Sequence, residues 1–460
     1  MKDTLNNKLQ ELESSDLLPM HMPGHKRNPC VAPEGISLGK DITEIEGFDN
    51  LHSPSGVIRN IERKARELWG SDDAFISVNG ASALLVAAIL SHTKRGDKIL
   101  VAANCHISVW HAIELGGLTP VISDPVLEEE YPFAMGLSAE AFKASLEEGI
   151  TAAVITSPTY EGVISDTKAI HDICKEQGIL LIVDEAHGAH FGIKGTNCFP
   201  PTADSDIVIK SVHKTMNAPT QTAVLLTYGD KADKRLLRHY LSVTESTSPS
   251  YMLMAGLEKA LYNSDADALY TEVTKLRNEL KSLNVLKLFE HTDSDPSKIV
   301  ILTEGAISGY ELSDILREKF LIEVEASFPD YIIAMTGTGD TSASLMRFAD
   351  AVKTIDSTLS KPASYKHKHM AVPSARSFKL SIEDAVRASS SKVHFEEAEG
   401  EVSSEYIFAY PPGVPLLIPG QEITEEVISL LTKYEERGIA LKTDPYRTWD
   451  GKLLKVDTNT

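Results

Sequence analysis

The feature that most constrains the fold is a series of short apolar runs that alternate with helical segments between residues 73 and 228. The runs are rich in β-branched residues, have the length of strands, and are separated in several places by helical stretches such as ASALLVAAILSHTKRG. This alternation indicates βαβ units, and therefore a large, mostly parallel sheet with helices on both faces. The predicted strands are DAFISV (73–78), KILVAA (98–103), TPVIS (119–123), AAVITS (152–157), ILLIVD (179–184), DIVIKS (206–211) and AVLLTY (223–228).

The length of the chain predicts more than one domain. A chain of 460 residues exceeds what one ordinary core supports. An N-terminal helix and loop precede the large α/β domain, and long helices at 249–285 lead from it into a smaller α/β unit. Residues 360–377, rich in Lys, His, Ser and Pro, are interpreted as a linker to a C-terminal domain. The predicted divisions are 1–60, 61–265, 266–360 and 361–460.

Composition excludes several classes of function. The net charge of −21 argues against a nucleic-acid partner and against anionic lipid, because both need a basic surface. No apolar run approaches the roughly 20 residues that a membrane span requires, and the polar start MKDTLNNKLQELESSD has no signal-peptide core. The four cysteines are scattered, without a CxxC pair, as in a reducing compartment. A cytoplasmic protein is predicted.

Candidate functional residues follow the predicted strands, because ligands of open α/β sheets bind beyond the carboxyl ends of the strands. The first strand is followed by Asn79, Gly80, Ala81 and Ser82, and then by a helix. A turn of small residues at a helix N-terminus offers N–H groups and a favourable dipole to an anion. An ordinary helix cap is the competing interpretation.

Two further strands end in candidate residues. His106 follows the second strand, where a histidine serves as a stacking or acid–base group, or is simply a loop residue facing solvent. Asp184 closes the apolar fifth strand, and a buried carboxylate there needs a cationic or hydrogen-bonding partner. The spacing of Asp184, His187 and His190 also suits a metal. Nearby glycines disfavour a regular helix, however, and no metal site is predicted.

The sixth strand ends in the sequence KSVHKT, which contains two lysines. Lys210 lies within the strand and is expected to be structural. Lys214 lies just beyond the strand end, after Ser211 and His213. A lysine buried in such a crevice can have a lowered pKa and form a Schiff base.

The candidate residues converge on one cofactor, pyridoxal 5′-phosphate (PLP). Its phosphate needs an anion-binding turn, its aldehyde needs a lysine, and its flat ring needs a stacking partner. Its pyridine nitrogen needs a carboxylate to stay protonated, which makes the ring an electron sink. The four requirements are met by the turn at 79–82, by Lys214, by His106 and by Asp184.

With these residues placed, the chain resembles the bacterial ornithine/lysine/arginine decarboxylases over nearly its whole length. These enzymes are a branch of the fold type I, aspartate-aminotransferase-like PLP enzymes. The combination of HMPGHK, SVHKT and YPPGVP is specific to them, and the match lacks their N-terminal receiver-like extension. The matching segments are HMPGHKRN (21–28), DITEIEGFDNLHSPSG (41–56), VNGAS (78–82), NCHISV (104–109), SPTYEG (157–162), VDEAHGAHFG (183–192), KSVHKT (210–215), TSPSY (247–251) and YPPGVPLLIPG (410–420).

The resemblance implies a role for each candidate residue. It implies that Lys214 forms the Schiff base, that Asp184 pairs with the pyridine nitrogen, and that His106 stacks on the ring. It also implies a homodimer with shared active sites, or a higher oligomer. The other implied contacts are Gly80, Ala81 and Ser82 in the phosphate turn, His187 near the ring, Ser211 and His213 on the phosphate side or in catalysis, and Thr247 and Ser248 toward the phosphate of a neighbouring subunit.

The implied reaction is decarboxylation of arginine, lysine or ornithine to an amine and CO2, in polyamine or amino-acid metabolism. Departures from the family pattern, such as Ile107 after the stacking histidine, leave the substrate open. Glu405 and Glu422 are candidates for binding a basic side chain. A transaminase on the same fold is the first alternative, with Arg347 as a candidate carboxylate ligand. A non-catalytic binding protein is the second.

Overall fold

The computed structural model describes residues 4–31, 33–34, 36–196, 198–367, 376–409, 413–444 and 447–457. The chain divides into two compact units, which are described in turn. Unit 1 comprises Met1–His92, Ile182–Leu269 and Gly337–Gly339. Unit 2 comprises Thr93–Leu181, Tyr270–Thr336 and Asp340–Thr460.

Unit 1 begins with two helices whose first turns are each bonded to a carboxylate. Helix α1 (Leu5–Glu13) buries its leucine face, and its first N–H groups donate to the carboxylate of Glu258 on α9 (Tyr251–Asn263). Helix α2 (Val57–Trp69) starts where the carboxylate of Asp49 accepts hydrogen bonds from several backbone N–H groups. Carboxylates at helix starts satisfy amides that have no acceptor within the helix. The short 3₁₀ helices Pro29–Val31 and Leu38–Lys40 lie between α1 and α2.

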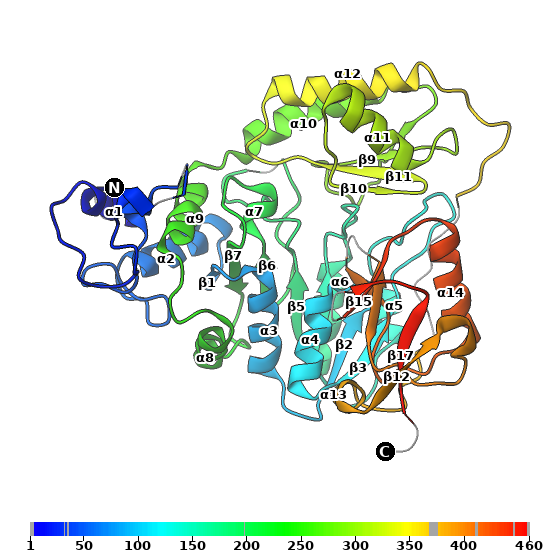
Figure 1. Cartoon of the computed structure of the whole chain (residues 1–460), viewed down its shortest axis with the longest axis horizontal. Helices are drawn as coiled ribbons and strands as arrows, with labels where there is room; N and C mark the ends of the chain where they lie inside the picture. The colour runs from blue at the N-terminus through cyan, green and yellow to red at the C-terminus, as the bar shows by residue number, and fades with distance from the viewer. Residues whose placement is uncertain are drawn as a thin grey trace. The chain divides into compact units, whose positions relative to one another are not determined.

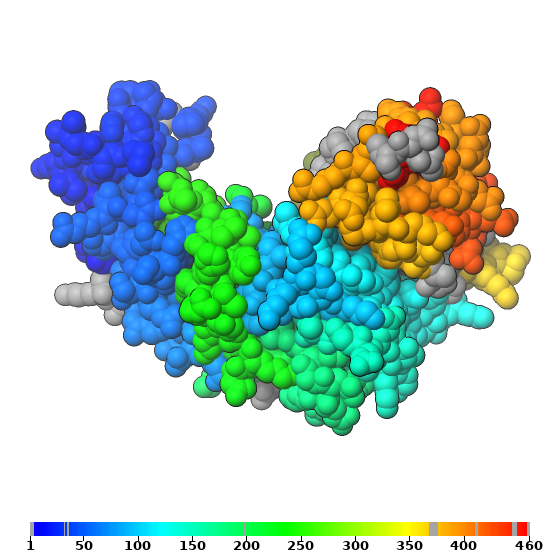
Figure 2. All heavy atoms as spheres, turned by 90° about the horizontal axis from the view of Figure 1, so that it is seen from below, coloured from blue at the N-terminus to red at the C-terminus, as the bar shows by residue number. Residues whose placement is uncertain are grey.

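The sheet strands of unit 1 include β6, whose end is followed by Lys214. They are β1 (Asp73–Ser77), β5 (Leu180–Asp184), β6 (Ile207–Lys210) and β7 (Ala223–Thr227). Every residue of β5, β6 and β7 is buried, as expected for strands covered on both faces. The helices are α3 (Gly80–His92), the single turn α7 (Val212–Thr215) and α8 (Lys234–Thr244). Helix α8 (green) packs along α3 (blue), as Figure 2 shows.

Unit 2 contributes three parallel strands with their crossover helices. Strand β2 pairs in parallel with β3 and with β4. The parallel direction follows from the connections, since each strand returns through a helix that packs on the sheet. The elements are β2 (Lys98–Ala102), α4 (Ile107–Gly116), β3 (Thr119–Ser123), α5 (Ala139–Ala144), β4 (Ile150–Thr156) and α6 (Thr167–Gln177).

The predicted fold class is confirmed. All seven predicted strands are present, in the sheet order β1-β7-β6-β5-β4-β2-β3 (Figure 1). The exception to parallel pairing is β7, which runs antiparallel to both β1 and β6. This architecture positions the candidate residues that follow β1, β5 and β6, because each stands at the carboxyl end of its strand.

A smaller α/β layer follows, as the sequence predicted for this region. Its antiparallel sheet has the order β10-β11-β9-β8, and helices α10, α11 and α12 cover one face of it (Figure 1). Leucine and isoleucine side chains from the helices and the sheet share one core. The elements are α10 (Ala266–Leu280), β8 (Lys287–Leu288), β9 (Lys298–Leu302), α11 (Gly309–Phe320), β10 (Ala326–Phe328), β11 (Tyr331–Met335) and α12 (Ser342–Asp356).

The C-terminal part of unit 2 has its own core between α14 and a small sheet of order β14-β13-β15-β16. A second pair, β12 with β17, completes it. The start of the YPPGVPLLIPG segment, residues 410–412, lies outside the described residues. The elements are α13 (Ile382–Arg387), β12 (Ser390–His394), the 3₁₀ helix Phe395–Glu397, β13 (Tyr406–Ala409), β14 (Val414–Leu417), α14 (Glu425–Glu436), β15 (Leu441–Asp444), β16 (Arg447–Thr448) and β17 (Lys452–Val456). Within the described ranges, no helix combines the length and apolar character needed to span a bilayer.

Candidate active site

Lys214 stands in the one-turn helix α7, directly beyond the end of β6. Its backbone N–H donates to the carbonyl of Ser211 at 3.1 Å, which closes the turn. The side chain is half-buried, and its Nζ lies 2.9 Å from Nε2 of His187. A lysine amine beside an imidazole has a partner that can take or return a proton.

Asp184, the last residue of β5, is a buried carboxylate with a perturbed pKa. It is 5% exposed, and its Oδ1 accepts a hydrogen bond from the N–H of Ala186 at 3.1 Å. Burial raises the pKa of Asp184, while the positive charge of Lys214 and the Ala186 N–H oppose that rise. A carboxylate in this environment gains from a cation brought against it, such as a protonated ring nitrogen.

His213 is held in a defined orientation next to Lys214. Its Nδ1 lies 3.0 Å from the carbonyl oxygen of Thr222, so Nδ1 carries the proton and donates it, because a carbonyl only accepts. Burial lowers the pKa of His213, the Thr222 bond raises it, and the charge of Lys214 lowers it, with a net lowering. His213 is therefore neutral at pH 7, and its Nε2 is a hydrogen-bond acceptor.

The turn predicted to bind an anion stands at the start of helix α3. Gly80 has a φ of +80°, and a Cβ placed there would meet no atom within 4 Å. Its N–H donates to the carbonyl of Gln221 at 2.8 Å. The next amides, of the half-buried Ala81 and the exposed Ser82, lie in the first helical turn, where no helical acceptor exists. The open space beside Gly80 and the N–H groups of the first helical turn are compatible with a phosphate.

Three further predicted contacts differ in burial. Ser211 is 2% exposed, and its side chain makes no capping hydrogen bond at the start of α7. Thr247 and Ser248 are exposed, with the N–H of Ser248 bonded to Oγ of Ser246 at 3.1 Å. Their contact with a neighbouring subunit remains a prediction.

His106 belongs to unit 2, where it caps helix α4. Its Nδ1 accepts a hydrogen bond from the N–H of Ser108 at 3.2 Å and lies 2.9 Å from Oγ of the same serine. The far edge of the ring faces Gly413, where an added Cβ would lie 3.8 Å from Cδ2 and Nε2. The ring is thus held between its own turn and the start of β14. Its stacking on a cofactor remains a prediction.

The unit 1 residues fit PLP. The fit rests on the raised pKa of the buried Asp184, on the amine of Lys214 next to His187, and on the open anion turn at Gly80. Each provides what one part of the cofactor needs: a charged ring nitrogen, an aldehyde and a phosphate.

Sequence reasoning missed the backbone groups that hold these side chains. The carbonyls of Gln221 and Thr222 orient Gly80 and His213, yet neither residue belongs to a recognisable motif. Every residue has a backbone carbonyl, so residue type does not indicate which carbonyls accept hydrogen bonds at the site. A signal existed only in the segment's place, directly before β7 and therefore beside the end of β6.

Some candidate residues have other roles in the structure. Glu405 is 2% exposed and accepts a hydrogen bond from the N–H of Leu454 at 2.6 Å, and Glu422 pairs with Lys379 at 3.0 Å. Arg347 donates to the carbonyls of Phe320 and Leu321 at the end of α11, as a cation at a helix C-terminus does. These three side chains thus have structural partners in unit 2.

The metal interpretation of Asp184, His187 and His190 is not supported by the packing. His190 is 0% exposed and lies between the rings of Phe191 and Phe199, at centroid distances of 4.7 Å and 4.5 Å. Throughout the part of the chain that the structure describes, no three His, Cys, Asp or Glu side chains are grouped to hold a metal ion.

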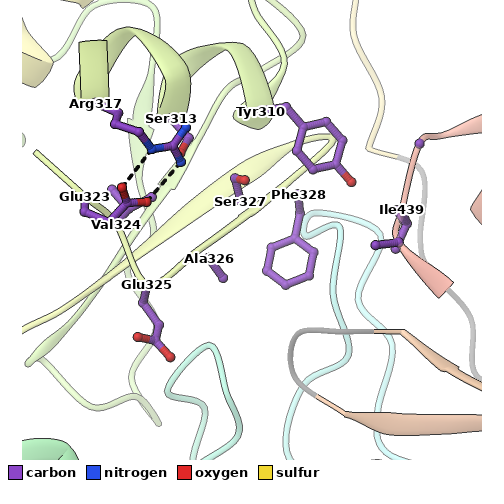
Figure 3. A pocket seen from close by; sticks show the side chains of 12 residues that line it. Tyr310, Ser313, Arg317, Glu323, Val324, Glu325, Ala326, Ser327, Phe328 and Ile439 are labelled. Carbon is purple, nitrogen blue, oxygen red and sulfur yellow. Dashed lines mark hydrogen bonds and ion pairs between the residues drawn. The ribbon is translucent and has the colours of Figure 1, made fainter. Parts of the chain in front are cut away.

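A pocket of about 280 Å³ lies within unit 2 among α11, β10 and residues 438–440 (Figure 3). Arg317 donates through Nε and Nη2 to both oxygens of Glu323, at 2.7 and 3.0 Å, so the two charges neutralise each other. Glu325 accepts a hydrogen bond from the hydroxyl of Tyr160 at 2.9 Å. No predicted site residue lines this pocket, and we assign it no role in the chemistry.

Known proteins include relatives that match most of the chain. The profile described as Orn/Lys/Arg decarboxylase, major domain, matches residues 20–295, and that of the C-terminal domain matches residues 363–439. An arginine decarboxylase of Bacillus subtilis is 30% identical, covering 94% of this chain and 94% of its own. An arginine decarboxylase of Halalkalibacterium halodurans is also 30% identical, covering 93% of each chain.

A solved structure agrees in fold. The lysine decarboxylase of Francisella novicida superposes with a TM-score of 0.82 at 21% identity, covering 99% of this chain and 81% of its own. At this identity the likeness concerns the fold, and it extends over the large sheet and the smaller layers that follow it.

Proposed function

The chain belongs to the Orn/Lys/Arg decarboxylase family, and on this premise we propose that it removes the α-carboxylate of a basic L-amino acid as CO2, with PLP as its cofactor. The observation that carries the proposal is the pairing at the ends of β5 and β6. There, the amine of Lys214 lies 2.9 Å from His187 and its charge acts on the buried Asp184. A reactive amine beside a buried carboxylate is what PLP chemistry requires.

Each residue of the pair has one task. Lys214 holds the aldehyde of the cofactor, and the N–H groups of Ala81 and Ser82 hold its phosphate. When bound, PLP accepts the electron pair that remains on Cα after CO2 departs. Asp184 keeps a proton on the ring nitrogen, and its low exposure makes this charge pair strong because little water screens it.

Decarboxylation consumes one proton at Cα for each CO2 released and needs no oxidant. The amine of Lys214 is one donor, because His187 can recharge it through their 2.9 Å contact. His213 is the other candidate for moving a proton: its Nδ1–H is fixed on Thr222, so its Nε2 would first have to take up a proton before delivering it to Cα. Both groups follow β6 directly, which places proton transfer beside the group that holds the cofactor.

We extend the proposal to a homodimer in the cytoplasm that acts in polyamine or amino-acid metabolism. Support comes from exposed apolar side chains near the N-terminus: Leu17, Leu18 and Met20 are 56%, 74% and 81% exposed. Contiguous exposed apolar residues mark association surfaces. Thr247 and Ser248 are also exposed and accessible to a second chain. Light scattering of the purified protein measures the assembly, and a monomer at micromolar concentration would contradict this part.

Among basic amino acids we propose arginine as the substrate, supported by the two relatives named arginine decarboxylase. The test is CO2 release from arginine, lysine and ornithine by the PLP-loaded protein, with product amines identified by mass spectrometry. We expect the highest kcat/KM on arginine. A keto-acid product without CO2 would instead indicate transamination, and no turnover with any of the three would refute the proposal.

A further inference from the structure

We propose that Lys210 is a positioning residue: its buried ammonium fixes the turn 185–191, and thereby holds His187 against Lys214. The proposal concerns the face of the sheet opposite the candidate site. Only the expected change in kcat rests on the proposed function. The expected ordering of the turn 185–191 by Lys210 does not depend on it.

The strand geometry separates two carboxylates that are adjacent in the sequence. Strands β5 and β6 are parallel, with Asp184 opposite Ile209, and the N–H of Glu185 donates to the Ile209 carbonyl at 2.9 Å. Because successive side chains of an extended segment point to opposite faces, Asp184 and Glu185 diverge. Asp184 faces the lysine of α7, and Glu185 faces the lysine within β6.

Lys210 uses its three N–H donors on three acceptors of one turn. Its Nζ bonds the carboxylate of Glu185, the carbonyl of Gly188 at 3.0 Å and the carbonyl of Phe191 at 3.2 Å. Lys210 and Glu185 are 0% and 1% exposed, so no water competes for these donors. An ammonium has three donors, and all are committed to residues that flank His187.

Neighbouring groups leave the turn little freedom. The indole N–H of Trp69 donates to the carbonyl of Ala189 at 3.2 Å, and its ring lies 5.5 Å from the Lys210 ammonium. A Cβ added to Gly188 would come within 2.7 Å of the Phe191 ring and 2.9 Å of the Glu185 side chain. After His187, the carbonyls of Gly188, Ala189 and Phe191 are therefore each bonded, and before it the carboxylate of Glu185 is bonded.

Stability alone does not account for this arrangement. The desolvation free energy lost when an ion pair is buried is about as large as the attraction gained. Well-packed apolar residues in its place often give a protein of equal stability. Apolar side chains form no directional hydrogen bonds, so they cannot hold two backbone carbonyls at fixed positions around one atom. A fixed turn places His187 Nε2 at 2.9 Å from the amine, a distance that a mobile turn would not maintain.

The test is the double variant Lys210→Met with Glu185→Gln, which removes both charges while keeping the side-chain lengths. Lys194→Met, the same change at an exposed lysine after the turn, is the matched control. Hydrogen–deuterium exchange of residues 185–192 without added cofactor is the first readout. The melting temperature, PLP affinity, kcat and KM are the others.

We expect exchange in 185–192 to accelerate at least about tenfold in the double variant, with other segments unchanged. We expect kcat to fall about 10- to 100-fold with KM nearly constant, because misplacement affects the reacting geometry. A folded double variant with unchanged exchange and kcat would overturn the proposal, as would equal effects in the control. If the wild-type protein releases no CO2 but the double variant still exchanges faster in 185–192, the proposed function is refuted. The inference about the turn then still holds.

Discussion

Two lysine–carboxylate pairs stand at the ends of the same two strands, and they differ in almost every property that matters for chemistry. Lys210 and Glu185 are fully buried, and the lysine donates to one carboxylate and two carbonyls. Lys214 is half-buried beyond the strand and contacts an imidazole, with Asp184 influenced by its charge. The reactivity of these two lysines therefore depends on their partners rather than on residue type.

The partners decide whether the amine can react. The three acceptors around Lys210 favour its ammonium form, which has no electron pair to offer, and they oppose the lowering of its pKa that burial causes. The imidazole of His187 beside Lys214 has ring nitrogens that can both donate and accept a proton. One pair is therefore suited to holding a turn, and the other to holding a cofactor.

The largest expected effect comes from removing the reactive lysine. Lys214→Ala should reduce CO2 release by about 10⁴-fold or more, because it removes the covalent attachment point. The visible absorption of the PLP-loaded protein should change with it. Unfolding in urea should change far less than for Lys210→Met, since the Lys214 side chain is half-buried and Asp184 keeps the hydrogen bond from the Ala186 N–H. Full activity in this variant would show that Lys214 is not the lysine that holds the cofactor.

The second effect tests the buried pair through stability. Lys210→Met alone should lower the free energy of unfolding by about 3–5 kcal/mol, because it leaves the Glu185 carboxylate buried without a cation. Burial raises the pKa of Glu185 from 4.5 to about 7 even with Lys210 present. A raised folded-state pKa costs stability as pH rises through it, so the loss should be larger at pH 8 than at pH 5.

Denaturant unfolding at both pH values measures this loss. Adding Glu185→Gln should restore most of it, since no charge is then buried. If the Lys210→Met protein were as stable as wild type at pH 8, Glu185 would not need a positive charge beside it in the folded protein.

The third effect separates function from stability at Asp184. Asp184→Asn should lower kcat about 10²- to 10³-fold, because the ring nitrogen loses its charged partner. The cofactor-free variant should nevertheless be more stable than wild type at pH 8 and similar at pH 4. Burial raises the pKa of Asp184, so the wild type loses stability as pH rises through that value, whereas Asn does not titrate. Thermal scans at the two pH values test the sign.

A smaller effect is expected at the predicted stacking residue. His106→Leu should weaken PLP binding about 3- to 10-fold by removing an aromatic contact, and His106→Phe should bind nearly as wild type. Equilibrium dialysis measures both affinities. Equal losses in the two variants would show that the imidazole acts through its nitrogens rather than through its face.

The smallest effect is expected for a cation outside both pairs. Arg347→Ala should leave kcat and KM within about twofold of wild type and cost about 0.3–1 kcal/mol of stability, as a helix C-terminal cation does. Steady-state kinetics with arginine and a melting curve measure both. A large rise in KM would revive Arg347 as a substrate carboxylate ligand and favour transamination.

Much of the fold was predictable because long α/β domains carry strong periodic signals. All seven predicted strands are present, several beginning or ending one or two residues from their predicted limits, as for AAVITS (152–157), which is β4 (Ile150–Thr156) in the structure. The antiparallel direction of β7 was not predicted, because periodicity is the same in either direction. The short strands of the C-terminal part were also missed, since segments such as β16 (Arg447–Thr448) are too short for a pattern.

The candidate site was predictable as far as side chains at strand ends reveal it. Asp184 and Lys214 stood out because each directly follows an apolar run, and the structure places them within electrostatic reach of each other. The roles considered for Glu405 and Arg347 depended on composition and distance along the chain, neither of which indicates a contact. Both side chains are bonded to backbone groups of their own unit instead.

The amino-acid sequence alone shows which residues follow each strand, and therefore separates a lysine inside β6 from a lysine beyond it. That information is local, because a strand ends where its apolar run ends. Only the tertiary structure decided the partners: the turn that brings two carbonyls to Lys210, and the imidazole that meets Lys214. Partners arise when separate segments fold together and exclude water, and no single segment carries that information.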